Sequence, residues 1–196
     1  QKLLRSICLI LFFLALLLTY SRSGYISFTV GLIGYTFFSK SLKPLLIIPL
    51  LVISLLFLPR PASEGTRLER TASITARVSG YTNAMQDISA KTLFIGNGWF
   101  LTNANRVAPA KWLPSHSSSP DNSYLHVLQS TGILGLALFV IWISLFFIET
   151  SQPEFSAIGL VFATGALFNN VLLYPWVLVV LWAFAAIVIS GKLKRG

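Results

Sequence analysis

The distribution of apolar residues constrains the fold of this chain more than any other feature. Residues 59–122 form a polar segment that holds seven of the 15 basic and four of the six acidic residues. Three long apolar runs precede this segment and three follow it. Because a membrane-spanning helix needs about 20 mostly apolar residues, the pattern predicts an all-α integral membrane protein with about six transmembrane helices and a long external loop.

The predicted organisation has three regions. Residues 1–58 contain three transmembrane helices, residues 59–122 are the external loop, and residues 123–196 contain three more helices and a basic cytoplasmic tail. The expected spans are Leu3–Thr19, Gly24–Phe38, Pro44–Leu58, Ser123–Ile148, Phe155–Leu173 and Pro175–Ser190.

The charges in the short connections predict the orientation. If every segment spans once, seven basic residues fall on one side: Lys2, Arg5, Lys40, Lys43, Lys192, Lys194 and Arg195. The opposite short connections carry only Arg22. The positive-inside rule therefore predicts that both termini are cytoplasmic and that the polar segment is external.

Composition argues against several other classes of protein. The net charge of +9 could indicate a nucleic-acid partner, but the basic residues are spread over helix ends, so we expect membrane lipids and no nucleic acid. Cys8 is the single cysteine, and the two histidines lack a ligand cluster at metal spacing, so the sequence predicts no metal site and no cofactor. The first residue is Gln rather than Met, which is consistent with further helices upstream.

An amphipathic helix is predicted within the polar segment, from near residue 71 to near residue 90. Its apolar residues recur at steps of three and four: Ile74, Val78, Tyr81, Met85 and Ile88. This stripe would rest on the helix bundle or on lipid headgroups. Arg70 and Arg77 project beside the stripe. Each would either pair with an anion, because unpaired burial of a charge is costly, or extend to lipid phosphates.

Three further stretches are candidates for function. Arg22 is the only charge in its short turn, and it could bind a ligand or a lipid headgroup. Gly96-Asn97-Gly98 favours a tight turn with positive φ. A helix start is predicted at Ser119, Pro120 and Asp121. Asp121 is then a carboxylate favoured by the helix dipole, or alternatively a general base. His116 is an alternative base.

The order of these motifs resembles the C-terminal half of the O-antigen ligase and O-antigen polymerase family, over roughly Leu14 to Val140. A Ser-Arg-Ser-Gly turn at residues 21–24 comes first, and Leu-Phe-Ile-Gly-Asn-Gly-Trp-Phe at residues 93–100 follows the arginine-bearing stretch. Asp-Asn-Ser-Tyr-Leu at residues 121–125 then precedes Thr-Gly-Ile-Leu-Gly-Leu at residues 131–136.

The resemblance implies a bacterial inner-membrane enzyme that takes a glycan from an undecaprenyl-diphosphate carrier on the periplasmic face. The acceptor would be another glycan or a lipid. Arg22 and Arg77 would hold the diphosphate, with Arg70 as support, because guanidinium groups bind phosphate oxygens in a bidentate manner. Asp121 or His116 would deprotonate the acceptor hydroxyl, and Asn122 and Tyr124 would orient the sugar.

Two departures from the family pattern weaken the assignment as a lipopolysaccharide ligase and leave the polymerase, exopolysaccharide and protein-glycan ligase branches open. Ligases usually have His-Asn where this chain has Asp121-Asn122, and the family often has Glu where this chain has Ser130. The chain is also about half the length expected for the family. A transporter or flippase component is the rival hypothesis, and it would require polar residues in broken spans. The third hypothesis is an inactive fragment or a scaffold subunit.

Overall fold

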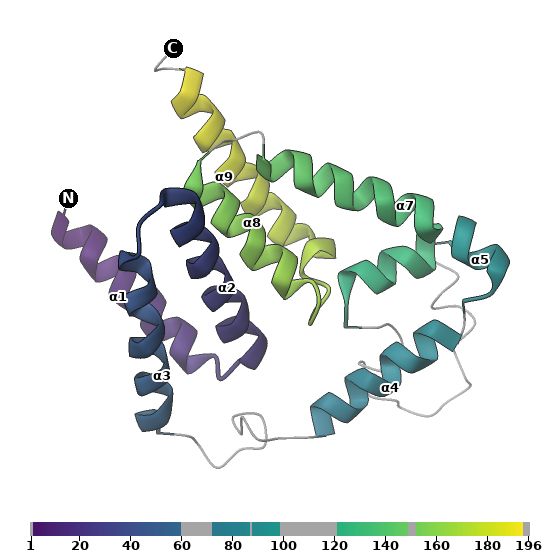
Figure 1. Cartoon of the computed structure of the whole chain (residues 1–196), viewed down its shortest axis with the longest axis horizontal. Helices are drawn as coiled ribbons and strands as arrows, with labels where there is room; N and C mark the ends of the chain where they lie inside the picture. Colours follow the sequence, from purple (N-terminus) through teal and green to yellow (C-terminus); the bar gives the residue numbers. More distant parts are fainter. Residues whose placement is uncertain (1, 60–71, 87, 99–120, 149–151, 194–196) are drawn as a thin grey trace.

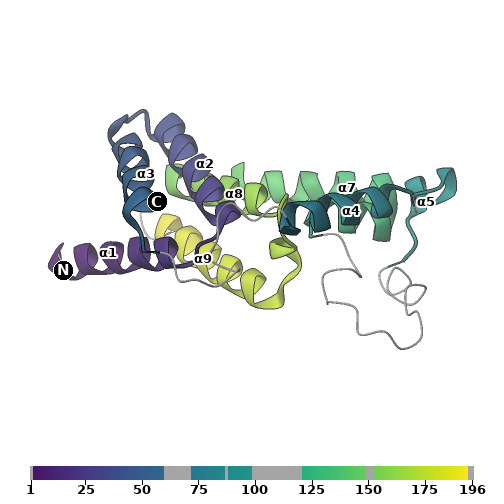
Figure 2. The ribbon, with the colours of Figure 1, turned by 90° about the horizontal axis from the view of Figure 1, so that it is seen from below.

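The computed structural model describes residues 2–59, 72–86, 88–98, 121–148 and 152–193. Within these ranges the regular structure is helical, with no strand, so the all-α prediction is confirmed. Two groups of helices are visible in both views (Figures 1 and 2). One group contains α1 (Lys2–Leu18), α2 (Arg22–Ser39), α3 (Ile47–Phe57), α8 (Pro153–Gly165) and α9 (Pro175–Leu193). The other contains α4 (Ala72–Gln86), α5 (Ala90–Ile95) and α7 (Ser123–Ile148), and it extends to one side.

The most extensive helix pair in the first group is α2 against α8. Glycines make this close approach possible, because a side chain at Gly31 would collide with Val161 and one at Gly34 would collide with Leu160. At the other end of the pair, Gly165 lies beside Ser27. The two helices are therefore antiparallel, and the start of α2 lies at the same end as the last turn of α8.

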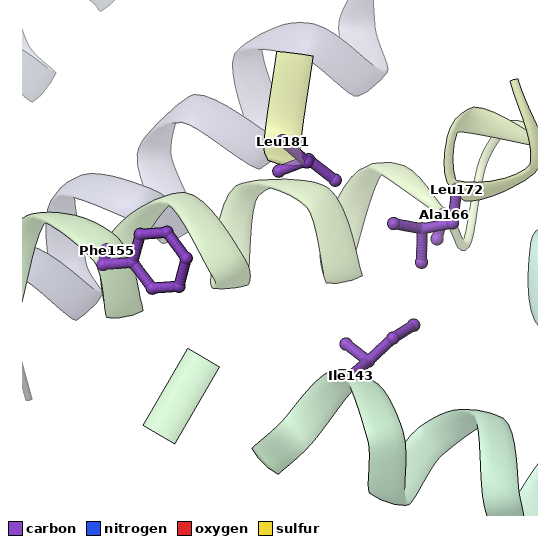
Figure 3. Packing of buried hydrophobic residues seen from close by; sticks show 5 residues of the cluster. All are labelled: Ile143, Phe155, Ala166, Leu172 and Leu181. Atoms are coloured by element: carbon purple, nitrogen blue, oxygen red, sulfur yellow. The ribbon is translucent and has the colours of Figure 1, made fainter. Parts of the chain in front are cut away.

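Two apolar clusters stabilise the helix packing, and the larger one also joins α7 to the first group. Ile143, Phe155, Ala166, Leu172 and Leu181 come from α7, α8 and α9 and from the α8–α9 connection, and they form the larger cluster (Figure 3). Leu17, Tyr25 and Leu51 join α1, α2 and α3. Many other large apolar side chains of the helices are exposed, among them Phe12, Phe57 and Trp176. Exposed apolar surface on this scale indicates contact with lipid or with other apolar helices.

The structure corrects the prediction of one continuous helix over residues 123–148. Gly132 has φ 71° and ψ −173°, so α7 consists of a first arm (residues 123–131) and a second arm (residues 133–148). Figure 1 shows the chain turning back at this point. Hydrogen bonding explains the break, because the carbonyl oxygens of Gln129 and Ser130 accept from the backbone N–H groups of Asn97 and Gly98 at 2.7 and 3.0 Å.

The predicted span over residues 155–173 is also shorter than expected. α8 ends at Gly165, and a turn and the 3₁₀-helix η4 (Val171–Leu173) follow before α9 begins. In the first half of the chain, a further 3₁₀-helix, η1 (Lys43–Leu46), precedes α3. By length and composition, one helix among the described residues could cross a membrane, Ser123–Leu145, and it contains the Gly132 break. Six spans therefore remain a prediction.

A helix, α4, lies where the amphipathic helix is predicted, but three residues of the apolar stripe do not face the rest of the protein. Ile74, Val78 and Met85 are 48, 54 and 59% exposed. Ala84 is buried instead, since α4 packs against α7 through that side. Ile74, Val78 and Met85 therefore do not rest on the helix bundle, and their contact with lipid headgroups remains a prediction.

Candidate functional site

The first arm of α7 begins with a side-chain cap that the sequence did not predict. Asn122 Oδ1 accepts a hydrogen bond from the backbone N–H of Leu125 at 3.0 Å, which is the usual role of an N-cap residue. Ser119 and Pro120, the expected start, lie outside the described residues. Because Asn122 takes the capping role, the Asp121 carboxylate is left available for another partner.

That partner is Arg77 of α4. Arg77 Nε lies 3.8 Å from Asp121 Oδ2, and both side chains are partly exposed. A partly exposed ion pair of this length contributes about 1 kcal/mol or less to stability. The pair therefore adds little to the fold, while it brings a guanidinium group and a carboxylate together where the polar segment meets a helix start.

Tyr81 holds α4 in the position that makes this pairing possible. Its single hydroxyl hydrogen is shared between the carbonyl oxygens of Asp121 and Leu167, which lie 3.1 and 3.0 Å from the hydroxyl oxygen. Burial raises the pKa of Tyr81; the charge of Arg77 and a side-chain hydrogen bond with Asn122 lower it, and the charge of Asp121 raises it further. The phenol therefore remains a protonated donor at neutral pH.

A second contact fixes the other end of the first arm to α4. Gln129 is buried, and its Nε2 donates to the carbonyl oxygen of Ala84 at 2.9 Å. Together with Tyr81, this bond aligns α4 along the first arm. Neither residue was predicted as functional, although a glutamine within an apolar run is a signal that a buried amide needs a partner.

The Gly-Asn-Gly turn reinforces the same arrangement. Gly96 and Gly98 have φ of 76° and 81°, as the sequence predicted. A side chain at Gly96 would collide with the backbone of Ser130, and one at Gly132 would collide with the backbone of Phe94. The two backbones therefore cross in direct contact, and both crossing points require glycine.

The α8–α9 connection supports the start of the first arm from the opposite side. The backbone N–H of Ser123 donates to the carbonyl oxygen of Ala166 at 2.8 Å, and Ser123 Oγ donates to that of Asn169 at 3.1 Å. The resemblance implies that Tyr124 orients the sugar. Its hydroxyl donates to the carbonyl oxygen of Ala163 at 3.0 Å, and its ring lies edge-on to that of Phe139. These contacts attach α7 to α8 next to the Arg77–Asp121 pair.

Arg22 is the first residue of α2, after the N-cap Ser21, whose side chain accepts from the backbone N–H of Gly24 at 3.2 Å. The antiparallel register of α2 and α8 puts this helix start at the same end as Gly165. The residues that follow Gly165 bind Ser123 and Tyr81. Arg22 thus lies at the end of the helix group that carries the site.

The two remaining predicted site residues, Arg70 and His116, lie outside the described ranges. His126, which is not among the predicted site residues, is buried within the first arm. In the part of the chain that the structure describes, no three His, Cys, Asp or Glu side chains gather as metal ligands would.

These features define a class of protein: an all-α chain with extensive exposed apolar surface and an arginine–carboxylate site at a helix start. The family model described as O-antigen ligase matches residues 7–140, more than half of the chain, and the chain therefore belongs to the O-antigen ligase family. Members of this family are membrane proteins, and the match supports a role in membrane glycan processing. Searches of the curated proteins and of the solved structures returned no significant match.

Proposed function

We propose that this protein is a glycan transferase that moves or polymerises an oligosaccharide or polysaccharide from undecaprenyl diphosphate on the periplasmic face of the bacterial inner membrane. The observation that carries the proposal is the Arg77–Asp121 pair, in which a cation and a candidate base from two distant parts of the chain meet. Both residues lie within the region that matches the family. The proposed topology has six spans, cytoplasmic termini and an external polar segment.

Arg77 would bind the diphosphate of the carrier. A guanidinium group offers several N–H donors in a fixed plane and stays charged, so it neutralises a departing diphosphate without changing its own protonation. The 3.8 Å separation from Asp121 is longer than a charge-assisted hydrogen bond of about 2.8 Å. A phosphate oxygen would therefore compete with a weak contact. Arg22, from the adjacent end of α2, would supply a second positive charge, and Arg70 would support it.

Asp121 would act as the general base, with His116 as the alternative. The acceptor hydroxyl loses its proton to the carboxylate, and its oxygen forms a new bond to the anomeric carbon. The bond from that carbon to the diphosphate oxygen breaks, and the carrier leaves with the bonding electrons. Attack opposite the leaving group inverts the configuration of the anomeric carbon. Asn122 and Tyr124, on either side of Ser123, would orient the sugar.

Arg77→Ala tests the proposal. A deletion strain is complemented with each variant, and the transferred glycan and the accumulated carrier-linked glycan are measured. Losing one group that stabilises the transition state costs about 10²- to 10³-fold in rate, so we expect transfer to fall by at least that factor while carrier-linked glycan accumulates. Arg77→Lys should recover only part of the activity, because it keeps the charge and loses the planar group.

Lys91→Ala is the matched control. Lys91 is an exposed basic residue on α5, so this variant removes the same charge from the polar segment away from the pair, and its activity should equal that of the wild type. Membrane yield must be the same for all variants. Full activity of Arg77→Ala would refute the diphosphate role.

The break in α7 supports a second candidate, a component of polysaccharide export. Interrupted helices commonly hold the substrate site of transporters, and the first arm buries His126, Gln129 and Ser130 just before Gly132. Proteoliposomes containing the purified protein and a fluorescent carrier-linked glycan distinguish the two. Movement of the glycan across the bilayer without transfer would favour export, and transfer to an added acceptor would favour the enzyme.

A further inference from the structure

A second polar surface adjoins the site on the α8–α9 connection. Tyr174 and Trp176 stack with ring centroids 5.1 Å apart and an interplanar angle of 13°. Trp176 is 67% exposed, so the stacked Tyr174 ring covers part of the indole while much of it stays open. The Tyr174 hydroxyl donates to Asn169 Oδ1 at 3.3 Å, and the backbone N–H of Asn170 donates to the same oxygen at 2.9 Å. The connection thus presents a fixed aromatic platform beside two carboxamides.

This platform shares its support with the Arg77–Asp121 pair. The carbonyl oxygen of Asn169 accepts from Ser123 Oγ at 3.1 Å, and Ser123 lies two residues after Asp121. Leu167, two residues before Asn169, accepts from Tyr81. A ligand on the platform would therefore be held relative to Asp121 by the hydrogen bonds that position the base.

The chemistry of the platform selects for a neutral, polyhydroxylated ligand. Residues 166–176 carry no charged side chain, so an anion or a cation finds no counter-charge here. An aromatic face binds apolar C–H surfaces, and carboxamides donate to and accept from hydroxyl groups. A pyranose ring combines an apolar face with a rim of hydroxyl groups and suits both features.

We propose that Tyr174 and Trp176, with Asn169 and Asn170, form a subsite that binds one neutral pyranose unit of the reacting glycan. This inference rests on the proposed function, since that function supplies the glycan. The family match ends at residue 140, so the subsite lies outside the matched region and would contribute to the glycan specificity of this particular chain.

Binding of free sugar tests the subsite. The full-length protein in lipid nanodiscs is titrated calorimetrically with the neutral repeat-unit oligosaccharide released by mild acid from the surface polysaccharide of the host. We expect Trp176→Ala to weaken binding about tenfold and Trp176→Phe to recover most of the affinity, because phenylalanine keeps an aromatic face. Trp182→Ala is the control. Trp182 is an exposed tryptophan on the same helix, and its ring centroid lies 6.1 Å from that of Trp142. The Trp182→Ala variant should bind the oligosaccharide as the wild type does.

The subsite would be overturned if the wild type did not bind the oligosaccharide or if Trp176→Ala left the affinity unchanged. An equal loss in Trp182→Ala would also overturn it, because a general membrane-anchoring role of tryptophan would then explain both variants. Failure of the proposed function can be distinguished from failure of the subsite. If the wild type binds the oligosaccharide but transfers none, the subsite stands without the enzyme. If Arg77→Ala abolishes transfer while Trp176→Ala leaves binding and KM unchanged, the enzyme stands without the subsite.

Discussion

Tyr81 connects three parts of the chain through one hydroxyl group. It belongs to α4, and it donates to carbonyl oxygens at the start of α7 and after the end of α8. The sequence predicted Tyr81 only as a member of the apolar stripe. The spacing of the apolar residues reveals the helical period, but it does not reveal which side of the helix packs against the protein. Asp121 was foreseen as a candidate base, and Arg77 was expected to pair with an anion or with lipid. That the anion is Asp121 depends on contacts between residues far apart in the sequence.

Tyr81→Phe should lower the stability of the protein and its activity together. The substitution removes the one O–H donor that the carbonyl oxygens of Asp121 and Leu167 share, and a hydrogen bond contributes about 0.5–1.5 kcal/mol, so we expect a loss of about 1 kcal/mol in unfolding free energy in detergent. Transfer should fall less than in Arg77→Ala, because the charges remain. Thr82→Ala is the control, since the exposed Thr82 hydroxyl bonds only within α4, to the carbonyl oxygen of Val78. Equal stability of the Phe variant and the wild type would exclude the anchoring role.

The raised pKa of Tyr81 predicts how this contribution depends on pH. The folded protein keeps the phenol protonated above pH 10, where the unfolded chain ionises. The stabilisation is therefore complete below pH 10 and is lost as the pH rises through the folded pKa. Absorbance of tyrosinate during alkaline titration, compared between the wild type and Tyr81→Phe, should show one tyrosine that ionises later than a free one. Titration of that residue at the ordinary pKa would contradict the prediction.

The broken helix α7 and the Gly-Asn-Gly turn form one structural element. Gly96 and Gly132 both have positive φ, and a side chain at either would meet the backbone of the other segment. The turn could be predicted because glycines on both sides of an asparagine are typical of positive φ. The break could not be predicted, because residues 133–148 continue the apolar helical pattern, and the hydrogen bonds that explain the break come from Asn97 and Gly98, far away in the sequence.

Gly132→Ala should be strongly destabilising. It introduces a side chain at φ 71° and against the backbone of Phe94, and backbone strain together with overpacking costs about 2–4 kcal/mol. Gly80→Ala is the matched control, since Gly80 lies within α4 and a side chain there would meet nothing within 4 Å. It should stabilise the protein by about 0.5–1 kcal/mol. Thermal unfolding in detergent measures both, and similar values for the two variants would show that the crossing is not rigid.

At the scale of the whole molecule, the sequence predicted the helical class, the family and the approximate positions of most helices. It also predicted uninterrupted spans over residues 123–148 and 155–173, and the structure interrupts both. Apolar composition predicts neither the break at Gly132 nor the turn after Gly165. The orientation in the membrane rests on the distribution of basic residues alone, and it can be tested without assuming any activity.

Cysteine labelling measures this orientation. Cys8 is the only cysteine, so Cys8→Ala provides a background in which Lys91→Cys and Leu42→Cys can be compared. Both positions are exposed. A membrane-impermeant maleimide applied to intact spheroplasts should label Lys91→Cys and leave Leu42→Cys unlabelled until the cells are lysed. The reverse pattern would place the polar segment in the cytoplasm and exclude a periplasmic reaction.

Binding of the carrier itself tests the central claim most directly. Purified wild type, Arg77→Ala and Lys91→Ala in nanodiscs are titrated with undecaprenyl diphosphate, and the bound lipid is counted by native mass spectrometry. We predict that Arg77→Ala binds the diphosphate at least tenfold more weakly than the wild type, while Lys91→Ala binds it equally well. Undiminished binding by Arg77→Ala would contradict the claim that the Arg77–Asp121 pair is the diphosphate site.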